Sequence, residues 1–276
     1  MYVENASAPA RKPVTVPSLH QMKAEGRKIV MLTAYDASFA AQLEHAGVDI
    51  ALVGDSLGMV IQGQRSTLPV TLDQMVYHTS LVARGLSATL LVADMPFMAD
   101  RNVDYVLEAG TRLVGEAGAA MVKIEGAAPH ILEAIHALTE RVIPVCAHLG
   151  LTPQSVHKFG GYKVQGREHE AAERVVSEAL AIQQAGADML VLEGVPTALG
   201  TRVTEALDIP VIGIGAGPHC DGQVLVIYDM LGITPGKRPK FSKDFLAGRG
   251  SVQEAIAAYT ADVRSGAFPA AEHGYN

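Results

Sequence analysis

The sequence predicts an α/β fold in which eight parallel strands close into a (β/α)8 TIM barrel. Short apolar runs alternate along the chain with amphipathic stretches that end in glycine. The runs are apolar at consecutive positions, which is typical of parallel strands that helices cover on both faces. Eight such units in about 250 residues fit a closed barrel better than the alternative, a doubly wound open sheet.

Each expected strand is an apolar run that lies between two helical patterns. The strands are 29–35, 49–54, 89–94, 120–125, 142–148, 187–193, 210–214 and 224–228. The helical patterns are 37–46, 73–85, 102–117, 128–140, 168–185, 197–206, 243–248 and 251–264. The start of the chain is polar and contains proline, so we expect an N-terminal arm over 1–15. A single catalytic barrel domain with C-terminal helices should then occupy 16–276.

Three segments repeat one plan in which a helix ends in Ala-Gly and a strand follows and ends in an acid. They are HAGVDIALVGD (45–55), EAGAAMVKIEG (116–126) and QAGADMLVLEG (184–194). The glycine is the expected left-handed end of a helix and would occur in any α/β protein. The terminal acids have no such structural reason, and they indicate a functional edge of the sheet.

The composition excludes several classes of function. The 276 residues are 49% hydrophobic and 18% charged, which is ordinary for a soluble globular protein. A net charge of −7 argues against a surface for nucleic acid or anionic membranes. Cys146 and Cys220 give no disulfide framework, and we find no secretory signal or transmembrane-length run. We therefore expect a cytoplasmic enzyme that acts on small molecules.

Polar groups follow six of the expected strands at the point where each strand ends. In a parallel barrel these ends converge on one mouth, where active sites of this architecture form. Lys123 and Glu125 are two residues apart and point to the same side of their strand. Because Ile124 faces the helices, that side is the barrel interior. The full set is Tyr35, Asp36, Asp55, Ser56, Asp94, Lys123, Glu125, His148 and Glu193.

Asp55, Asp94 and Glu125 end neighbouring strands and predict a metal site. Clustered carboxylates repel one another unless a cation or protons neutralise them. Oxygen ligands suit Mg²⁺. His148 is either an active-site residue or a hydrogen-bonded core histidine. For Asp36 we favour a structural role as the N-cap of the next helix.

A bound Mg²⁺ ion with open positions can hold the carboxylate and ketone of a 2-oxo acid and stabilise its enolate. Lys123 would bind the substrate carboxylate or balance the charge of the acids. Glu193, on a separate strand, would be the general base or acid, and its apolar strand favours a raised pKa. These residues predict a Mg²⁺-dependent enzyme that makes or breaks carbon–carbon bonds next to a 2-oxo acid.

Two loops of the predicted barrel are longer than usual, at 56–72 and 149–167. Long loops at the mouth of a barrel often act as lids or as walls for a cofactor. The glycine-rich segment GIGAGPHCDG (213–222) would either cradle an anion or allow close packing between strand and loop.

Nine segments follow, in order, the pattern of one known family. Spread from about residue 15 to 265, they make the chain resemble the ketopantoate hydroxymethyltransferase family. More distant relatives are the phosphoenolpyruvate mutase and isocitrate lyase enzymes, which also use Mg²⁺ and 2-oxo acids in a barrel. The segments are MLTAYD (31–36), VGDSLGMV (53–60), DMPF (94–97), VKIEG (122–126), HLGLTPQ (148–154), GGYKVQGR (160–167), LEGVP (192–196), IPVIGIGAG (209–217) and DGQVLV (221–226).

The resemblance implies a barrel of the phosphoenolpyruvate mutase/isocitrate lyase type and assigns roles to several residues. Asp55, Asp94 and Glu125 match the acids of a Mg²⁺ site, with Asp55 and Asp94 acting partly through water. Asp55, Ser56, Asp94 and Lys123 match the contacts to the substrate 3-methyl-2-oxobutanoate.

Glu193 matches the catalytic base of the family, and His148 matches a polar residue of the active-site rim. The implied reaction transfers a hydroxymethyl group from 5,10-methylenetetrahydrofolate to C3 of 3-methyl-2-oxobutanoate. The products are 2-dehydropantoate, for pantothenate and coenzyme A synthesis, and tetrahydrofolate. Members of the family are typically homodecamers.

Two other functions fit a barrel with these acids. One is a carbon–carbon lyase or mutase of the isocitrate lyase type, which typically carries a lid cysteine in a KKCGH-like motif. The sequence has no such segment. The other is a binding barrel without catalysis, which would lack one of the acids or the base.

Overall fold

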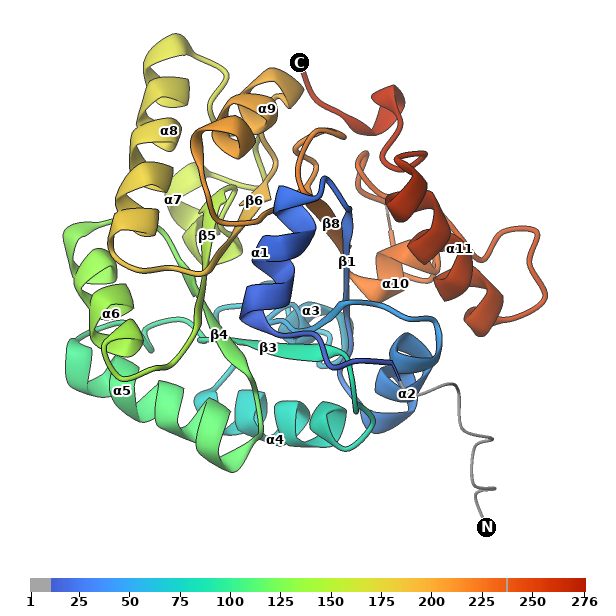
Figure 1. Ribbon diagram of the computed structural model, residues 1–276, viewed down its shortest axis with the longest axis horizontal. Helices are drawn as coiled ribbons and strands as arrows, with labels where there is room; N and C mark the ends of the chain where they lie inside the picture. Colours follow the sequence, from blue (N-terminus) through green and yellow to red (C-terminus); the bar gives the residue numbers. More distant parts are fainter. Residues whose placement is uncertain (1–10, 237) are drawn as a thin grey trace.

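The computed structural model describes residues 11–236 and 238–276 and contains a closed barrel of eight parallel strands (Figure 1). Each strand pairs with the next in sequence order, and β8 (Gly222–Leu225) closes the barrel on β1 (Ile29–Thr33). The predicted (β/α)8 fold is confirmed. The first ten residues of the expected arm lie outside the described part, and 11–15 have no helix or strand.

Helices alternate with the strands and surround the barrel (Figure 1). The remaining strands are β2 (Ile50–Val53), β3 (Leu90–Asp94), β4 (Met121–Glu125), β5 (Val145–Gly150), β6 (Met189–Glu193) and β7 (Val211–Ile214). The α-helices are α1 (Val16–Ala24), α2 (Ala37–His45), α3 (Leu57–Val60), α4 (Leu72–Ala83), α5 (Val103–Thr111), α6 (Pro129–Thr139), α7 (Val156–Phe159), α8 (His169–Gln184), α9 (Thr197–Ala206), α10 (Ile227–Met230) and α11 (Val252–Ser265). A π-helical turn (Arg112–Glu116) extends α5, and Pro153–Ser155 and Ala271–His273 form 3₁₀ turns.

Alternate strand residues point into the barrel and fill it with apolar side chains. The residues between them face outward and pack against the helices in a second, larger cluster. Filling the interior excludes water from it and leaves the mouth as the place where polar strand residues have room. The interior residues include Ile29, Met31, Ile50, Leu52, Leu90, Val92, Met121, Cys146, Met189, Val191 and Ile212.

Helix α1, which the sequence analysis did not predict, closes the end of the barrel opposite the mouth. A capping box between Thr15 and Ser18 starts the helix. Leu19 and Met22 are buried against the interior side chains. Lys23 Nζ lies 2.8 Å from Oδ2 of Asp221, which immediately precedes β8, so the helix sits beneath the strand starts.

The helix expected at 243–248 is wrong. Oδ1 of Asp244 accepts the N–H groups of Leu246 and Ala247, at 3.0 and 2.9 Å, and so competes with a helical hydrogen-bond pattern. The N–H of Phe245 donates to the carbonyl of Met230, at 2.8 Å, which ties the segment to α10 instead.

The expected bounds of two strands also need correction. Strand β5 begins at Val145 rather than 142, because Val142 adopts a left-handed φ of 56° in a turn. The last strand occupies 222–225 rather than 224–228. The N–H of Ile227 donates to Oγ1 of Thr33, at 2.9 Å, and α10 begins at that residue.

Glycines of the 213–222 segment allow close packing between backbone and side chains. A Cβ at Gly222 would lie 2.3 Å from the carbonyl oxygen of Ile29, and one at Gly213 would lie 2.9 Å from Sγ of Cys220. These contacts favour the packing role over an anion cradle. Both cysteines are free and buried. In the described residues, no helix has the length and apolar character that crossing a membrane requires.

Candidate active site

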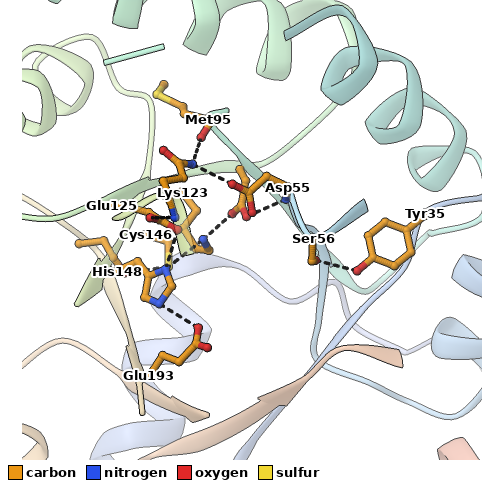
Figure 2. A network of polar contacts seen from close by, with 12 residues as sticks. Tyr35, Asp55, Ser56, Met95, Lys123, Glu125, Cys146, His148 and Glu193 are labelled. Carbon is orange, nitrogen blue, oxygen red and sulfur yellow. Dashed lines mark hydrogen bonds and ion pairs between the residues drawn. The ribbon is translucent and has the colours of Figure 1, made fainter. Parts of the chain in front are cut away.

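A cavity of about 490 Å³ opens at the C-terminal ends of the strands. Of the polar residues predicted at the strand ends, Asp36 does not line this cavity. It caps α2 by accepting the N–H of Phe39, at 2.9 Å, as expected. Figure 2 shows the polar side chains of the cavity converging from β3, β4, β5, β6 and the loop after β2. All predicted metal, substrate and base residues line this cavity: Asp55, Ser56, Asp94, Lys123, Glu125, His148 and Glu193.

The two-residue period of the strands aims most of these side chains inward. Asp94 continues the interior row of Leu90 and Val92, and Lys123 and Glu125 continue the row of Met121. His148 and Glu193 continue the interior rows of their own strands in the same way. The strand pattern alone therefore accounts for five of the seven positions.

Asp55 reaches the cavity by a different route, through a turn after β2. The backbone N–H of Asp55 donates to Oδ2 of Asp94, at 3.0 Å. A Cβ at Gly54 would lie 2.7 Å from Oγ of Ser56 and 3.5 Å from Oδ2 of Asp94. The absence of a side chain at Gly54 thus leaves room for the Ser56 hydroxyl in this turn, whereas the distance to Asp94 is an ordinary contact.

Lys123 forms a buried ion pair at the centre of the acids. Its Nζ lies 2.8 Å from Oδ1 of Asp94, and both side chains are almost fully buried. Burial alone would lower the pKa of Lys123, but the charges of Asp94, Glu125 and Asp55 together hold it above its usual value. Lys123 therefore remains a cation inside the cavity.

One lysine does not neutralise three carboxylates. Burial raises the pKa of Asp55 to about 8, and the charges of Asp94 and Glu125 add to this shift. Burial likewise raises the pKa of Glu125 to about 7, although Lys123 opposes the shift. Without a cation, these acids take up protons near neutral pH, and a bound cation would neutralise them instead.

Gln154 bridges two of the acids from the loop after β5. Its Nε2 donates to Oδ2 of Asp55, at 2.9 Å, and its backbone N–H donates to Oε2 of Glu125, at 3.1 Å. The same Nε2 donates to the carbonyl of Met95, at 3.0 Å. Gln154 therefore holds the carboxylates of Asp55 and Glu125 in fixed directions.

His148 lies between Glu125 and Glu193 (Figure 2). Its Nδ1 is 3.3 Å from Oε1 of Glu125, and its Nε2 is 3.3 Å from Oε2 of Glu193. Burial, followed by the charge of Lys123, lowers the pKa of His148, whereas burial raises the pKa of Glu193. With only 2% of its surface exposed, His148 lies deeper than the rim position that the resemblance implies.

Tyr35 positions Ser56 at one side of the cavity. The hydroxyl oxygens of the two residues are 2.8 Å apart (Figure 2). Burial raises the pKa of Tyr35, so its hydroxyl stays protonated and acts as a hydrogen-bonding group. The result is a fixed hydroxyl on Ser56 beside the carboxylate of Asp55.

The sequence matches a family model, described as ketopantoate hydroxymethyltransferase, over residues 13–271. The chain belongs to the ketopantoate hydroxymethyltransferase family. A relative from Xanthomonas euvesicatoria pv. vesicatoria, named 3-methyl-2-oxobutanoate hydroxymethyltransferase, is 62% identical over 96% of this chain and 97% of its own. A relative with the same name from Nitrosococcus oceani is 57% identical over 95% of this chain and 99% of its own.

Solved structures with low sequence identity share the barrel fold of this chain. A phosphoenolpyruvate phosphomutase from Streptomyces platensis subsp. rosaceus has a TM-score of 0.59 at 16% identity, covering 79% of this chain and 82% of its own. A phosphonopyruvate hydrolase complex with oxalate and Mg²⁺ has a TM-score of 0.59 at 15% identity, covering 90% and 95%. These likenesses confirm the predicted barrel fold, which the chain shares with these two enzymes.

The donor set of the ketopantoate hydroxymethyltransferase cavity fits a hard cation. Oε1 of Glu125 is buried and accepts no hydrogen bond from the described residues, so it is free to bind a metal. Within the described residues, however, no group of three or more acidic, histidine or cysteine side chains is arranged so that it could hold a metal ion by itself. A Mg²⁺ ion here would take its remaining ligands from substrate and water, as Mg²⁺ commonly does.

Sequence reasoning missed several residues that line the cavity of this family member. Tyr162 lines the cavity and Gln154 contacts two of its acids, and both come from the long loop after β5, which was expected to be a wall without any particular residue being assigned. Asp229 follows the strand whose end was misplaced, and Tyr275 lies in a tail that matched no pattern. Two features of the sequence pointed toward these residues: a polar residue shortly after the end of a strand, and the unusual length of the loop after β5.

Proposed function

We propose that this chain transfers a hydroxymethyl group from 5,10-methylenetetrahydrofolate to C3 of 3-methyl-2-oxobutanoate. One observation carries the proposal: a single cavity holds cationic Lys123 among three carboxylates, with the separate carboxylate of Glu193 beyond His148. This arrangement supplies a binding site for a 2-oxo acid and a base beside it. The names of the close relatives support the same substrate.

The 2-oxo acid would bind between β2 and β4. Lys123 donates to the substrate carboxylate, and the fixed hydroxyl of Ser56 donates to a second oxygen. Asp55, Asp94 and Glu125 would hold a Mg²⁺ ion next to these groups. When bound, that ion supplies positive charge that makes the C3–H bond of the substrate more acidic.

Glu193 would remove the C3 proton. Burial raises its pKa, which makes its carboxylate a stronger base than an exposed glutamate. His148, 3.3 Å from Oε2 of Glu193, fixes the direction of that carboxylate. In the overall balance, C3 exchanges its hydrogen for the methylene carbon and water supplies the hydroxyl group. The two nitrogens of the folate each gain one hydrogen.

Proton exchange at C3 tests this function directly. The protein with Mg²⁺ and 3-methyl-2-oxobutanoate in deuterated water should exchange the C3 proton, and proton NMR would follow the loss of that signal. Adding 5,10-methylenetetrahydrofolate should then give 2-dehydropantoate. A protein that neither exchanges the proton nor forms the product would contradict the proposal.

The same reaction mixture distinguishes hydroxymethyl transfer from the alternative activity, a carbon–carbon lyase or mutase. That activity would cleave or rearrange a 2-oxo acid partner without consuming folate. Both described cysteines are fully buried, at 0% exposure, so neither occupies a mobile lid position of the kind that such lyases typically use. We infer that folate-dependent transfer is the activity of this cavity.

We further propose that the chain works in the cytoplasm as a homodecamer. The family membership supports this assembly, and the negative net charge of −7 is typical of a protein without nucleic-acid or anionic-membrane partners. Light scattering of the purified protein should give about ten times the chain mass of 29.1 kDa.

A further inference from the structure

Asp229 is a buried carboxylate of the cavity that the proposed reaction does not use. It lies in α10, directly after β8, and only 8% of its surface is exposed. The other acids of the cavity come from β2 to β6, around Lys123 and His148. Asp229 therefore lies in a different part of the barrel mouth and needs its own explanation.

The surroundings of Asp229 leave half of its carboxylate available. Oγ1 of Thr234 donates to Oδ1, at 2.6 Å. Within 11–236 and 238–276, Oδ2 has no hydrogen-bond donor. Because Asp229 lines the cavity, water or a ligand there must supply the remaining hydrogen bonds of its carboxylate. A ligand that brings N–H donors into the cavity would fill this role.

The walls beside Asp229 are apolar and partly flat. They are formed by the end of β8 and by the loop from α10 to the C-terminal region. Among the described residues of these segments that line the cavity, Asp229 is the one charged residue. The walls include Leu225, Val226, Pro235, Pro239, Phe241 and Tyr275.

The C-terminal tail supplies part of this wall because it is tied to the barrel. The carbonyl of Tyr275 accepts the N–H of Thr197, at 2.9 Å, at the start of α9. A Cβ at Gly215 would lie 2.9 Å from Phe241 and 3.1 Å from the Tyr275 ring, so both aromatic rings rest on the bare backbone after β7. The two rings are therefore held at the mouth next to the strand that bears Glu193.

We propose that Asp229 and these walls bind the 2-amino-4-oxo ring of the folate co-substrate. The ring is planar and fits between flat apolar side chains. Its amide N–H and the adjacent amino group donate side by side, as two parallel hydrogen bonds to one carboxylate require. The proposal rests on the proposed function, and it adds the residue that recognises the co-substrate.

This placement also puts the two substrates in contact. The 2-oxo acid would occupy the charged half of the cavity over β2 to β4, and the folate ring the apolar half over β7 and β8. Glu193 on β6 lies between the two halves in barrel order. The methylene carbon of the co-substrate would thus face C3 of the 2-oxo acid beside the base.

Asp229→Asn tests the proposal without changing the shape of the site. Asn can still accept the hydrogen bond from Thr234, but its amide group cannot accept two N–H donors. We expect tetrahydrofolate, measured by calorimetry with Mg²⁺ and the 2-oxo acid present, to bind at least about tenfold more weakly.

Asp36→Asn is the matched control. It makes the same chemical change at the end of β1, where Asn caps a helix as well as Asp does. It should leave tetrahydrofolate binding unchanged. Thermal unfolding of both variants checks that each is folded.

A tetrahydrofolate analogue without the 2-amino group sharpens the test. It should bind the wild type more weakly than tetrahydrofolate does, whereas Asp229→Asn should discriminate little between the two ligands. Equal discrimination by both proteins, or unchanged tetrahydrofolate affinity in Asp229→Asn, would overturn the assignment while leaving wild-type turnover intact. A wild-type protein that neither binds tetrahydrofolate nor forms product would overturn the proposed function itself.

Discussion

Glu193 is the residue on which the proposed chemistry depends most directly. Glu193→Gln keeps the size of the side chain and its place on β6 but removes the group that accepts the C3 proton. We expect turnover to fall by about 10²- to 10⁴-fold, with binding of 3-methyl-2-oxobutanoate by calorimetry largely unchanged. Glu205→Gln, on the exposed surface of α9, is the matched control. Unchanged turnover in Glu193→Gln would remove it as the base.

Asp94 joins the ion pair with Lys123 to the turn that carries Asp55. Asp94→Asn removes one negative charge from the proposed Mg²⁺ site. We expect the Mg²⁺ concentration for half-maximal activity to rise by about 10- to 100-fold. Asp104→Asn, an exposed change on α5, should leave the titration unaltered. An unaltered titration in Asp94→Asn would contradict the metal assignment.

At the scale of elements, the two long loops meet across the mouth of the cavity. Tyr162 donates from its hydroxyl to Sδ of Met59, at 3.3 Å, and so links the loop after β5 to α3. Both residues line the cavity. Tyr162→Ala should raise the KM for methylenetetrahydrofolate several-fold and leave folate-independent C3 exchange unchanged, because the loop would act as a wall for the larger substrate.

The control for this loop is Tyr77→Ala. Tyr77 is 60% exposed on α4, and Tyr162 is 51% exposed, so both variants lose a large exposed aromatic side chain. Steady-state kinetics with each substrate varied in turn gives the KM of each variant for the folate and for the 2-oxo acid separately. An effect of Tyr162→Ala confined to the 2-oxo acid would show that the loop does not contact the folate.

Helix α2 is joined to the start of β3 by one carboxylate. Glu44 accepts the N–H groups of Ser87, Ala88 and Thr89, at 3.0 to 3.2 Å. Burial would raise the pKa of Glu44, but these hydrogen bonds outweigh it and hold the pKa below its usual value. The charged form therefore stabilises the fold, and more so than it stabilises the unfolded chain.

The sign of the resulting pH dependence follows from the lowered pKa. The contribution of Glu44 is complete above its unfolded pKa of about 4.3 and is lost as the pH falls through the lower folded value. Glu44→Gln should lower the free energy of unfolding by about 1 kcal/mol at pH 7. Urea unfolding should show this difference shrinking below about pH 4. A difference independent of pH would contradict the role of its charge.

For the whole molecule, closure of the barrel pairs the first strand, β1, with the last strand, β8. The hydroxyl of Tyr259 on α11 lies 2.9 Å from the carbonyl oxygen of Met31 and 3.0 Å from that of Gln223, one on each side of the β1–β8 seam. Tyr259→Phe should lower the free energy of unfolding in urea by about 1–2 kcal/mol. Tyr77→Phe should have no measurable effect, and equal stability of Tyr259→Phe and wild type would show that the seam does not need this tie.

The barrel could be predicted because its signals are local. Strands such as 189–193 are apolar at consecutive positions, and each repeated Ala-Gly ends a helix wherever it occurs. Prediction failed where a tertiary contact overrides the local pattern. Asp244 turns 243–248 away from a helix, Thr33 ends the last strand early, and α1 forms over the bottom of a barrel that the sequence pattern does not display.

By itself the sequence determined which strands exist and that acids end several of them, because periodicity and strand ends are properties of neighbouring residues. Only the tertiary structure decided which groups meet. His148 lies between Glu125 and Glu193, and Gln154 joins two acids from a loop. Asp229 enters the same cavity from α10, after the last strand. These contacts depend on barrel closure and loop paths, which bring together residues far apart in the chain and leave no periodic trace in it.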